Sequence, residues 1–69
     1  MERNEYLKLC QQYAVTQQGA VWHNGIEYHP LGYTLKFDKS SKPIHIAILH
    51  DQNQNSEQNV PLHEVKKQI

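Results

Sequence analysis

The side chains best suited to acid–base chemistry in this 69-residue chain cluster over seven positions. They are an imidazole, a carboxylate, two amides and a hydroxyl, from His50, Asp51, Asn53, Asn55 and Ser56. General acid–base catalysis uses these groups, but no GxSxG-type turn surrounds Ser56. Cys10 falls on the core-facing side of a predicted helix, where a thiol is a poor nucleophile. We expect no catalytic residue. Asp51 and Asn53 are interpreted as turn caps, and a loop that hydrogen-bonds a nucleotide or a partner remains the alternative.

Histidine is the second residue type that could do chemistry, because neutral imidazole is a common ligand for zinc, copper and nickel. The chain has five, at His23, His29, His45, His50 and His63. No HxH pair, no HxxxH pair on a helix and no adjacent acidic pair gives a metal-site spacing. His29 and His45 share a sheet face only if their strands pair in a suitable register. We therefore expect no metal and no cofactor, and assign the histidines to polar strand positions and loops.

The stretch around Asn24-Gly25 predicts a tight hairpin, because both residues tolerate the positive φ angles of a type I′ turn. A two-residue loop pairs each residue before the turn with one after it, and paired residues share a face. One face then carries Val21, Ile26 and Tyr28. The opposite face carries Trp22, Glu27 and His29.

Trp22 is the only tryptophan, and two interpretations of it stay open. An exposed tryptophan offers large rigid contact area and is enriched among interface hot spots. Alternatively the N-terminal helix covers it, since Ala47 and Leu49 are expected on the same face and also need a partner.

The spacing of apolar residues along the sequence predicts the helix and strands that carry these side chains. Apolar residues recur at three- and four-residue spacing over about residues 4–15, which predicts an amphipathic helix. After Gly19 the period changes to two, with strands over about 20–23, 26–37, 44–50 and 58–61. Pro30 and Gly32 indicate a bend at 30–32. Strand 44–50 is apolar on both faces, so it should be central, with the helix on its second face.

These elements predict a single domain over residues 1–69 of the α+β class. Its architecture is an N-terminal amphipathic helix packed on a small antiparallel sheet or open barrel of about four strands. Tyr28, Tyr33 and Phe37 then share the apolar face with Leu35. Such a row resembles the stacking platform of an RNA-binding sheet, but we interpret it as core, because a chain this short has few aromatics to spare.

Charge and cysteine content narrow the function classes. Seven basic residues balance seven acidic ones, which disfavours general nucleic-acid binding and makes self-association easier. Three of the lysines, Lys36, Lys39 and Lys42, are interpreted as a solvated turn. One cysteine excludes an internal disulfide and fits a reducing compartment, and no apolar run is long enough for a membrane span. We expect a soluble protein of the bacterial cytoplasm that does not associate with membranes.

The segments GIEYHPLGYTLKFD, IHIAILHD and NVPLHEV, after an EYLKLC-type helix, carry a resemblance over about residues 3–65. In this order they resemble small accessory proteins encoded by phages and prophages of Gram-positive bacteria. None of the segments is a catalytic signature. The resemblance implies an accessory protein that binds and disables a host component, such as a defence-system protein or a nucleotide signal.

We expect a non-enzymatic accessory module that occludes a host protein. The predicted contact residues are Trp22, Glu27, His29, Asp51, Asn53, Asn55 and Ser56. Two other functions stay open: a homo-oligomer that sequesters a nucleotide or another small molecule between subunits, and a small nucleic-acid-binding barrel.

Overall fold

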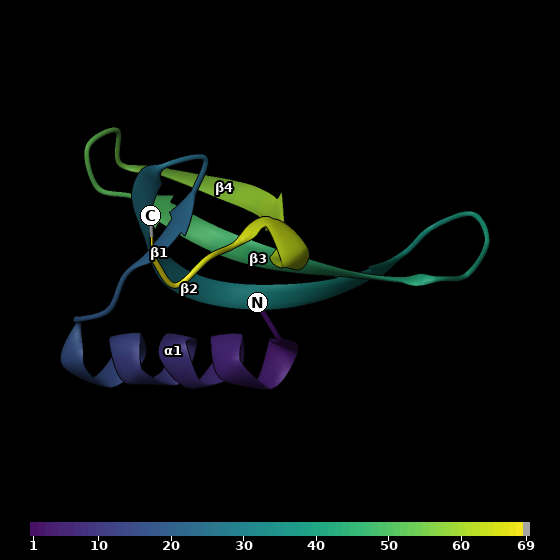
Figure 1. Cartoon of the computed structure of the whole chain (residues 1–69), viewed down its shortest axis with the longest axis horizontal. Coiled ribbons are helices and arrows are strands. Elements are labelled where there is room, and N and C mark those ends of the chain that lie inside the picture. The colour runs from purple at the N-terminus through teal and green to yellow at the C-terminus, as the bar shows by residue number, and fades with distance from the viewer. Residues whose placement is uncertain (69) are drawn as a thin grey trace.

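The computed structural model describes residues 1–68, in which one helix packs on one antiparallel sheet (Figure 1). The elements are α1 (Arg3–Thr16), β1 (Val21–His23), β2 (Ile26–Phe37), β3 (Pro43–Asp51), β4 (Ser56–Pro61) and the short 3-10 helix η1 (Leu62–Glu64). The strand order is β1-β2-β3-β4. The predicted α+β class is confirmed, and the sheet curls into a half-barrel. The element bounds differ from the ranges expected from sequence by two residues or fewer.

A two-residue turn at Asn24 and Gly25 joins β1 to β2. Their φ angles are 53° and 76°, both in the left-handed region that a type I′ turn requires. The register pairs Val21 with Tyr28 and Trp22 with Glu27, which confirms the predicted hairpin. Val21 and Tyr28 are buried. We call the sheet face that carries them the inner face; Trp22 and Glu27 lie on the outer face.

The predicted bend in β2 is a β-bulge between Pro30 and Gly32. Leu31 is the extra residue, so Tyr28 and Tyr33 reach the same face although five positions separate them. The fully buried Tyr6 of α1 meets the sheet at this point: its hydroxyl lies 2.8 Å from the Gly32 carbonyl oxygen and 3.1 Å from that of Ile48. The bulge therefore supplies the acceptors that hold the helix on the sheet.

The core lies on the inner face and is covered from two directions. Tyr6 of α1 and Leu62 and Val65 of the C-terminal segment all belong to it. Figure 1 shows α1 and the C-terminal segment approaching the sheet from different directions. The C-terminal segment also pairs with β1: the Trp22 amide donates to the Lys66 carbonyl at 2.8 Å, and the Lys66 amide donates to the Trp22 carbonyl at 2.9 Å. These bonds draw the two ends of the sheet together and produce the half-barrel shape.

Strand β3 lies between β2 and β4, so its predicted central position is confirmed. The helix was expected to cover the face of β3 that carries Ala47 and Leu49, and Tyr6 of α1 does pack into one core with these two residues. The other face of β3 stays half-buried or exposed at Ile44, Ile46 and Ile48.

The placement of Ala47 and Leu49 on the same face as Trp22 is wrong. They were expected beside Trp22, but the register pairs Ala47 with Tyr33 and Leu49 with Pro30, which places both on the inner face. Hydrophobic period shows that successive residues alternate between faces. It does not show which residues of neighbouring strands lie on the same face of the sheet, because the loop and the bulge set the register between the strands.

Candidate functional site

Strands β2 and β3 continue past the rest of the molecule as a two-stranded ribbon, which extends alone at the right of Figure 1. Within residues 1–68, residues 35–37 and 43–45 pair only with each other, because β4 reaches β3 no further than Ile46 and β1 reaches β2 no further than Tyr28. We call residues 35–45 the hairpin arm. Both of its edges present backbone N–H and C=O groups, which are the groups that pair with an added strand.

The hairpin arm exposes large apolar side chains. Phe37 is 66% exposed and Leu35 is 41% exposed, and Ile44 is exposed as well. Leu35 pairs with His45 and Phe37 with Pro43, so these four side chains continue the inner face of the sheet. In Figure 1, α1 and η1 extend no further than the base of the arm.

Tyr28, Tyr33 and Phe37 were all expected in the core, and for Phe37 this expectation is wrong. Tyr28 is buried and Tyr33 packs against the core, but Phe37 lies beyond the covering elements. Ile26, expected on the buried side of the first hairpin, is exposed too. An alternating pattern identifies the apolar face, whereas the length of the cover decides how much of that face is buried.

The tip of the hairpin arm is an ordered turn organised by Asp38. Its carboxylate accepts hydrogen bonds from the amides of Ser40 at 2.8 Å and Lys42 at 2.9 Å. The amide of Asp38 itself donates to the Lys42 carbonyl at 3.1 Å. The arm carries Lys36, Lys39 and Lys42 against the single acidic residue Asp38, so it is locally cationic in a chain whose formal net charge is zero.

Two of the residues predicted as contacts, Trp22 and Glu27, face each other across the first hairpin. Glu27 is exposed. Trp22 is half-buried beside the C-terminal segment, where it lines a cleft of about 370 Å³ together with His63, Glu64 and Lys66. The segment that lies beside the indole is therefore the C-terminal one, which hydrophobic period did not indicate as a partner.

His29, the third predicted contact on that face, is held inside a stack. Its ring lies 4.7 Å from the ring of Tyr13 on α1 and 6.5 Å from that of His50, centroid to centroid. Its Nδ1 donates to the Gly19 carbonyl at 2.9 Å. The register pairs His29 with His50 and places His45 on the inner face, so His29 and His45 do not share a face.

The polar residues at the end of β3 are divided between the two faces. Asp51 is buried, and its carboxylate accepts a hydrogen bond from the Asn53 amide at 2.9 Å, which is the predicted turn cap. His50 lies on the opposite face, 3.2 Å from Asn55 Oδ1. Ser56 Oγ is buried without a hydrogen-bond partner among residues 1–68. The imidazole, carboxylate and hydroxyl are therefore not arranged as a catalytic relay.

Cys10 lies on the core-facing side of α1, as expected, and packs against the core. Burial raises the pKa of its thiol, which keeps it in the protonated, weakly nucleophilic form. Within residues 1–68 no group of three His, Cys, Asp or Glu side chains is placed to hold a metal ion.

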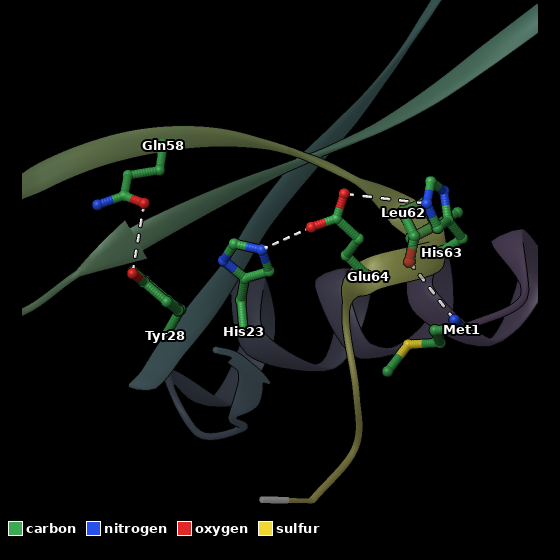
Figure 2. A network of polar contacts seen from close by, with 7 residues as sticks. All are labelled: Met1, His23, Tyr28, Gln58, Leu62, His63 and Glu64. Atoms are coloured by element: carbon green, nitrogen blue, oxygen red, sulfur yellow. Dashed lines mark hydrogen bonds and ion pairs between the residues drawn. The ribbon is translucent and has the colours of Figure 1, made fainter. Parts of the chain in front are cut away.

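One polar network was not foreseen from sequence. Figure 2 shows Glu64 of η1 reaching His23 of β1, with Nε2–Oε1 at 3.1 Å, while His63 Nε2 lies 3.9 Å from its other oxygen. Nearby, the Tyr28 hydroxyl donates to Gln58 Oε1 at 3.3 Å. Both contacts join residues far apart in sequence and close the half-barrel, so only the strand order could have pointed to them.

Comparison with protein-family models, with curated proteins and with solved structures gives no significant match for this chain. In residues 1–68 there is no helix whose length and apolar content would let it cross a membrane.

Proposed function

We propose that the chain is a non-enzymatic binding module that docks on a protein partner through the hairpin arm. The observation that carries the proposal is the exposure of Leu35, Phe37 and Ile44 on a ribbon without cover. A small domain with a thin core gains no stability from apolar side chains that stay in water, and exposed apolar patches of this kind mark interaction sites. An isolated two-stranded ribbon is also marginally stable by itself, so a partner that covers it would stabilise it.

The chemistry of the arm defines the partner surface that fits it. Leu35 and Phe37 need an apolar groove, and the lysines at positions 36, 39 and 42 favour carboxylates at its rim. The bare edges of β2 and β3 suit a partner that adds a strand. We propose a protein with an apolar groove and an acidic border.

The resemblance to phage and prophage accessory proteins makes a host protein of the bacterial cytoplasm the proposed partner, and occlusion of one of its surfaces the proposed effect. Rigid apolar anchors with a charged rim suit occlusion, because they cover a surface without chemistry. The face with Trp22 and Glu27 is the alternative contact surface, and the test below distinguishes it from the arm.

The test is affinity capture from a lysate of a Gram-positive bacterium, quantified by mass spectrometry. The wild type is compared with the double variant Leu35→Ser/Phe37→Ser and with Val15→Ser, a matched control that removes an apolar side chain 79% exposed on α1. We expect one or a few proteins to be recovered by the wild type and by Val15→Ser, and to be lost with the double variant. Higher salt should also weaken the capture, because rim charges are screened.

Equal recovery by the wild type and the double variant would refute the role of the arm. Loss of recovery with Trp22→Ala alone would move the contact to the outer face of the first hairpin. Light scattering tests whether the arm instead binds a second copy of the chain. In that case the wild type would form a discrete oligomer, and the double variant would be a monomer.

A further inference from the structure

We propose that a cleft at the base of the hairpin arm binds a small amphipathic carboxylate, a molecule with an apolar body and one anionic end. The cleft has a volume of about 460 Å³. It opens between β3, which contributes Ile44 and His45, and the ends of the two covering segments, which contribute Arg3, Leu62 and His63. This volume is within the usual range for small-molecule sites. The cleft shares Ile44 with the arm, but Leu35 and Phe37, the apolar anchors of the proposed protein contact, do not line it.

The lining of the cleft is basic, although the Glu64 carboxylate outside it lies 3.9 Å from His63 Nε2. Its side chains include a guanidinium and two imidazoles but no carboxylate. Within residues 1–68, Arg3 forms no ion pair. Glu2 lies in a neighbouring hollow that shares Arg3 and His45 with the cleft, but it does not line the cleft itself. An unpaired guanidinium beside an apolar wall suits a carboxylate, which it binds through two parallel hydrogen bonds.

A second donor is oriented by Tyr33. Its hydroxyl hydrogen-bonds Nδ1 of His45, and the two rings stack with centroids 5.8 Å apart. When the hydroxyl donates to Nδ1, the proton of the neutral imidazole resides on Nε2, which makes that nitrogen a donor toward a ligand oxygen. Tyr33 is a positioning residue in this scheme, because it acts through His45.

The rest of the cleft selects an apolar body. The cleft is also lined by the apolar residues Met1, Pro43, Ile44, Pro61 and Leu62. A ligand that only carried charge would leave these side chains in water, and a ligand that was only apolar would leave Arg3 unpaired. A flat or branched hydrocarbon with a single carboxylate satisfies both parts.

The experiment is an NMR titration of the full chain labelled with ¹⁵N, with 1-naphthoate as the probe. Its neutral amide and acetate serve as controls that lack the charge or the apolar body. We expect 1-naphthoate to shift the amide signals around the cleft. The neutral amide, and 1-naphthoate with the variant Arg3→Gln, should bind about tenfold more weakly, the usual effect of losing one charge-assisted hydrogen bond. Acetate should also bind more weakly, because it has no apolar body to cover the lining. Lys8→Gln removes a cation on the same helix that does not line the cleft, and should bind like the wild type.

Tyr33→Phe supplies a further check, since it keeps the ring and removes the hydroxyl that orients His45. We expect weaker binding of 1-naphthoate than in the wild type. Arg3 and Lys8 are exposed, and the spectra show directly whether each variant is folded. Equal affinity of 1-naphthoate and its amide, equal affinity of Arg3→Gln and wild type, or shifts confined to the tip of the arm would each overturn the proposal. None of these outcomes bears on capture of a protein by the arm.

Discussion

The covered body and the hairpin arm are built from the same two strands, yet their apolar side chains end in opposite environments. In the body, Ala47 and Leu49 of β3 are fully buried beneath Tyr6, Leu62 and Val65. Two residues further out on the same face, the cover ends, and Leu35 and Phe37 remain exposed. Along β2 the alternation of apolar residues continues across this boundary, from Tyr33 to Leu35 and Phe37. In a chain this short, the size of the core is therefore limited by how far the helix and the C-terminal segment extend over the sheet, and not by the pattern of the strands.

This difference implies that the body and the arm contribute to different properties of the protein. Side chains of the body should determine the free energy of unfolding, whereas side chains of the arm should determine binding. Substitutions in each region test this assignment.

The largest expected effect is the loss of a buried side chain from the body. Leu49→Ala should lower the free energy of unfolding by about 2–5 kcal/mol, because it removes buried methyl groups and leaves a cavity. Phe37→Ala, a larger truncation in the arm, should cost under about 0.5 kcal/mol, as for an exposed surface site. Urea unfolding followed by circular dichroism measures both. A cost for Phe37→Ala similar to that for Leu49→Ala would show that the arm belongs to the core.

Tyr6→Phe should lower the free energy of unfolding by about 1–3 kcal/mol, because it leaves the carbonyls of Gly32 and Ile48 without the hydroxyl that binds them. Burial also raises the pKa of Tyr6 above its ordinary value. The neutral hydroxyl therefore stabilises the fold fully below the unfolded-state pKa of about 10, and this contribution is lost as pH rises further. Urea unfolding at neutral and at alkaline pH should show a steeper alkaline loss for the wild type than for Tyr6→Phe. Equal slopes would contradict the buried hydroxyl bond.

Gly25→Ala should lower the free energy of unfolding by about 1 kcal/mol, because the residue has a φ of 76° that a side chain disfavours. Gly32→Ala is the matched control, since its new Cβ would lie 3.8 Å from Ile48 Cδ1, an ordinary contact. Thermal unfolding of the two variants compares them. A smaller loss for Gly25→Ala than for Gly32→Ala would count against the two-residue turn.

The smallest expected effect is that of Asp38→Ala at the tip of the arm. The change removes the acceptor for the amides of Ser40 and Lys42, yet the free energy of unfolding should change by under about 0.5 kcal/mol, because the turn is exposed and far from the core. NMR shift changes should be confined to the arm. Changes that reach the signals of Tyr6 or Leu49 would show that the arm and the body are coupled.

Much of the fold follows from local rules. The Asn24-Gly25 turn fixes the first hairpin, Pro30 and Gly32 mark the bulge, and a strand apolar on both faces is central. The facing of Ala47 and Leu49 could not be derived, because it depends on the register that a five-residue loop and a bulge set together. The pairing of Lys66 with Trp22 depends on where the last segment returns, and no local pattern encodes that.

The candidate site was harder to predict than the fold. Trp22 was proposed as a contact because of its residue type, but Phe37 is more exposed. Phe37 was predicted to be buried because it continues the regular alternation of apolar residues in its strand. A usable signal was present: β2 was expected to be much longer than the strand before it, so part of its length had to lack a neighbour. Arg3, His45 and His63 are too far apart in sequence for any spacing rule to bring them to one cleft.

Amide hydrogen exchange, measured by mass spectrometry on the free protein and on the complex recovered by capture, shows which residues the partner covers. In the free protein, the amides of the body should be protected and those on the outer edges of residues 35–45 should exchange quickly. In the complex, we predict that protection rises over residues 35–45 and stays unchanged around Trp22 and over residues 51–58. Protection that rises there instead, with the arm still exchanging as in the free protein, would contradict the account.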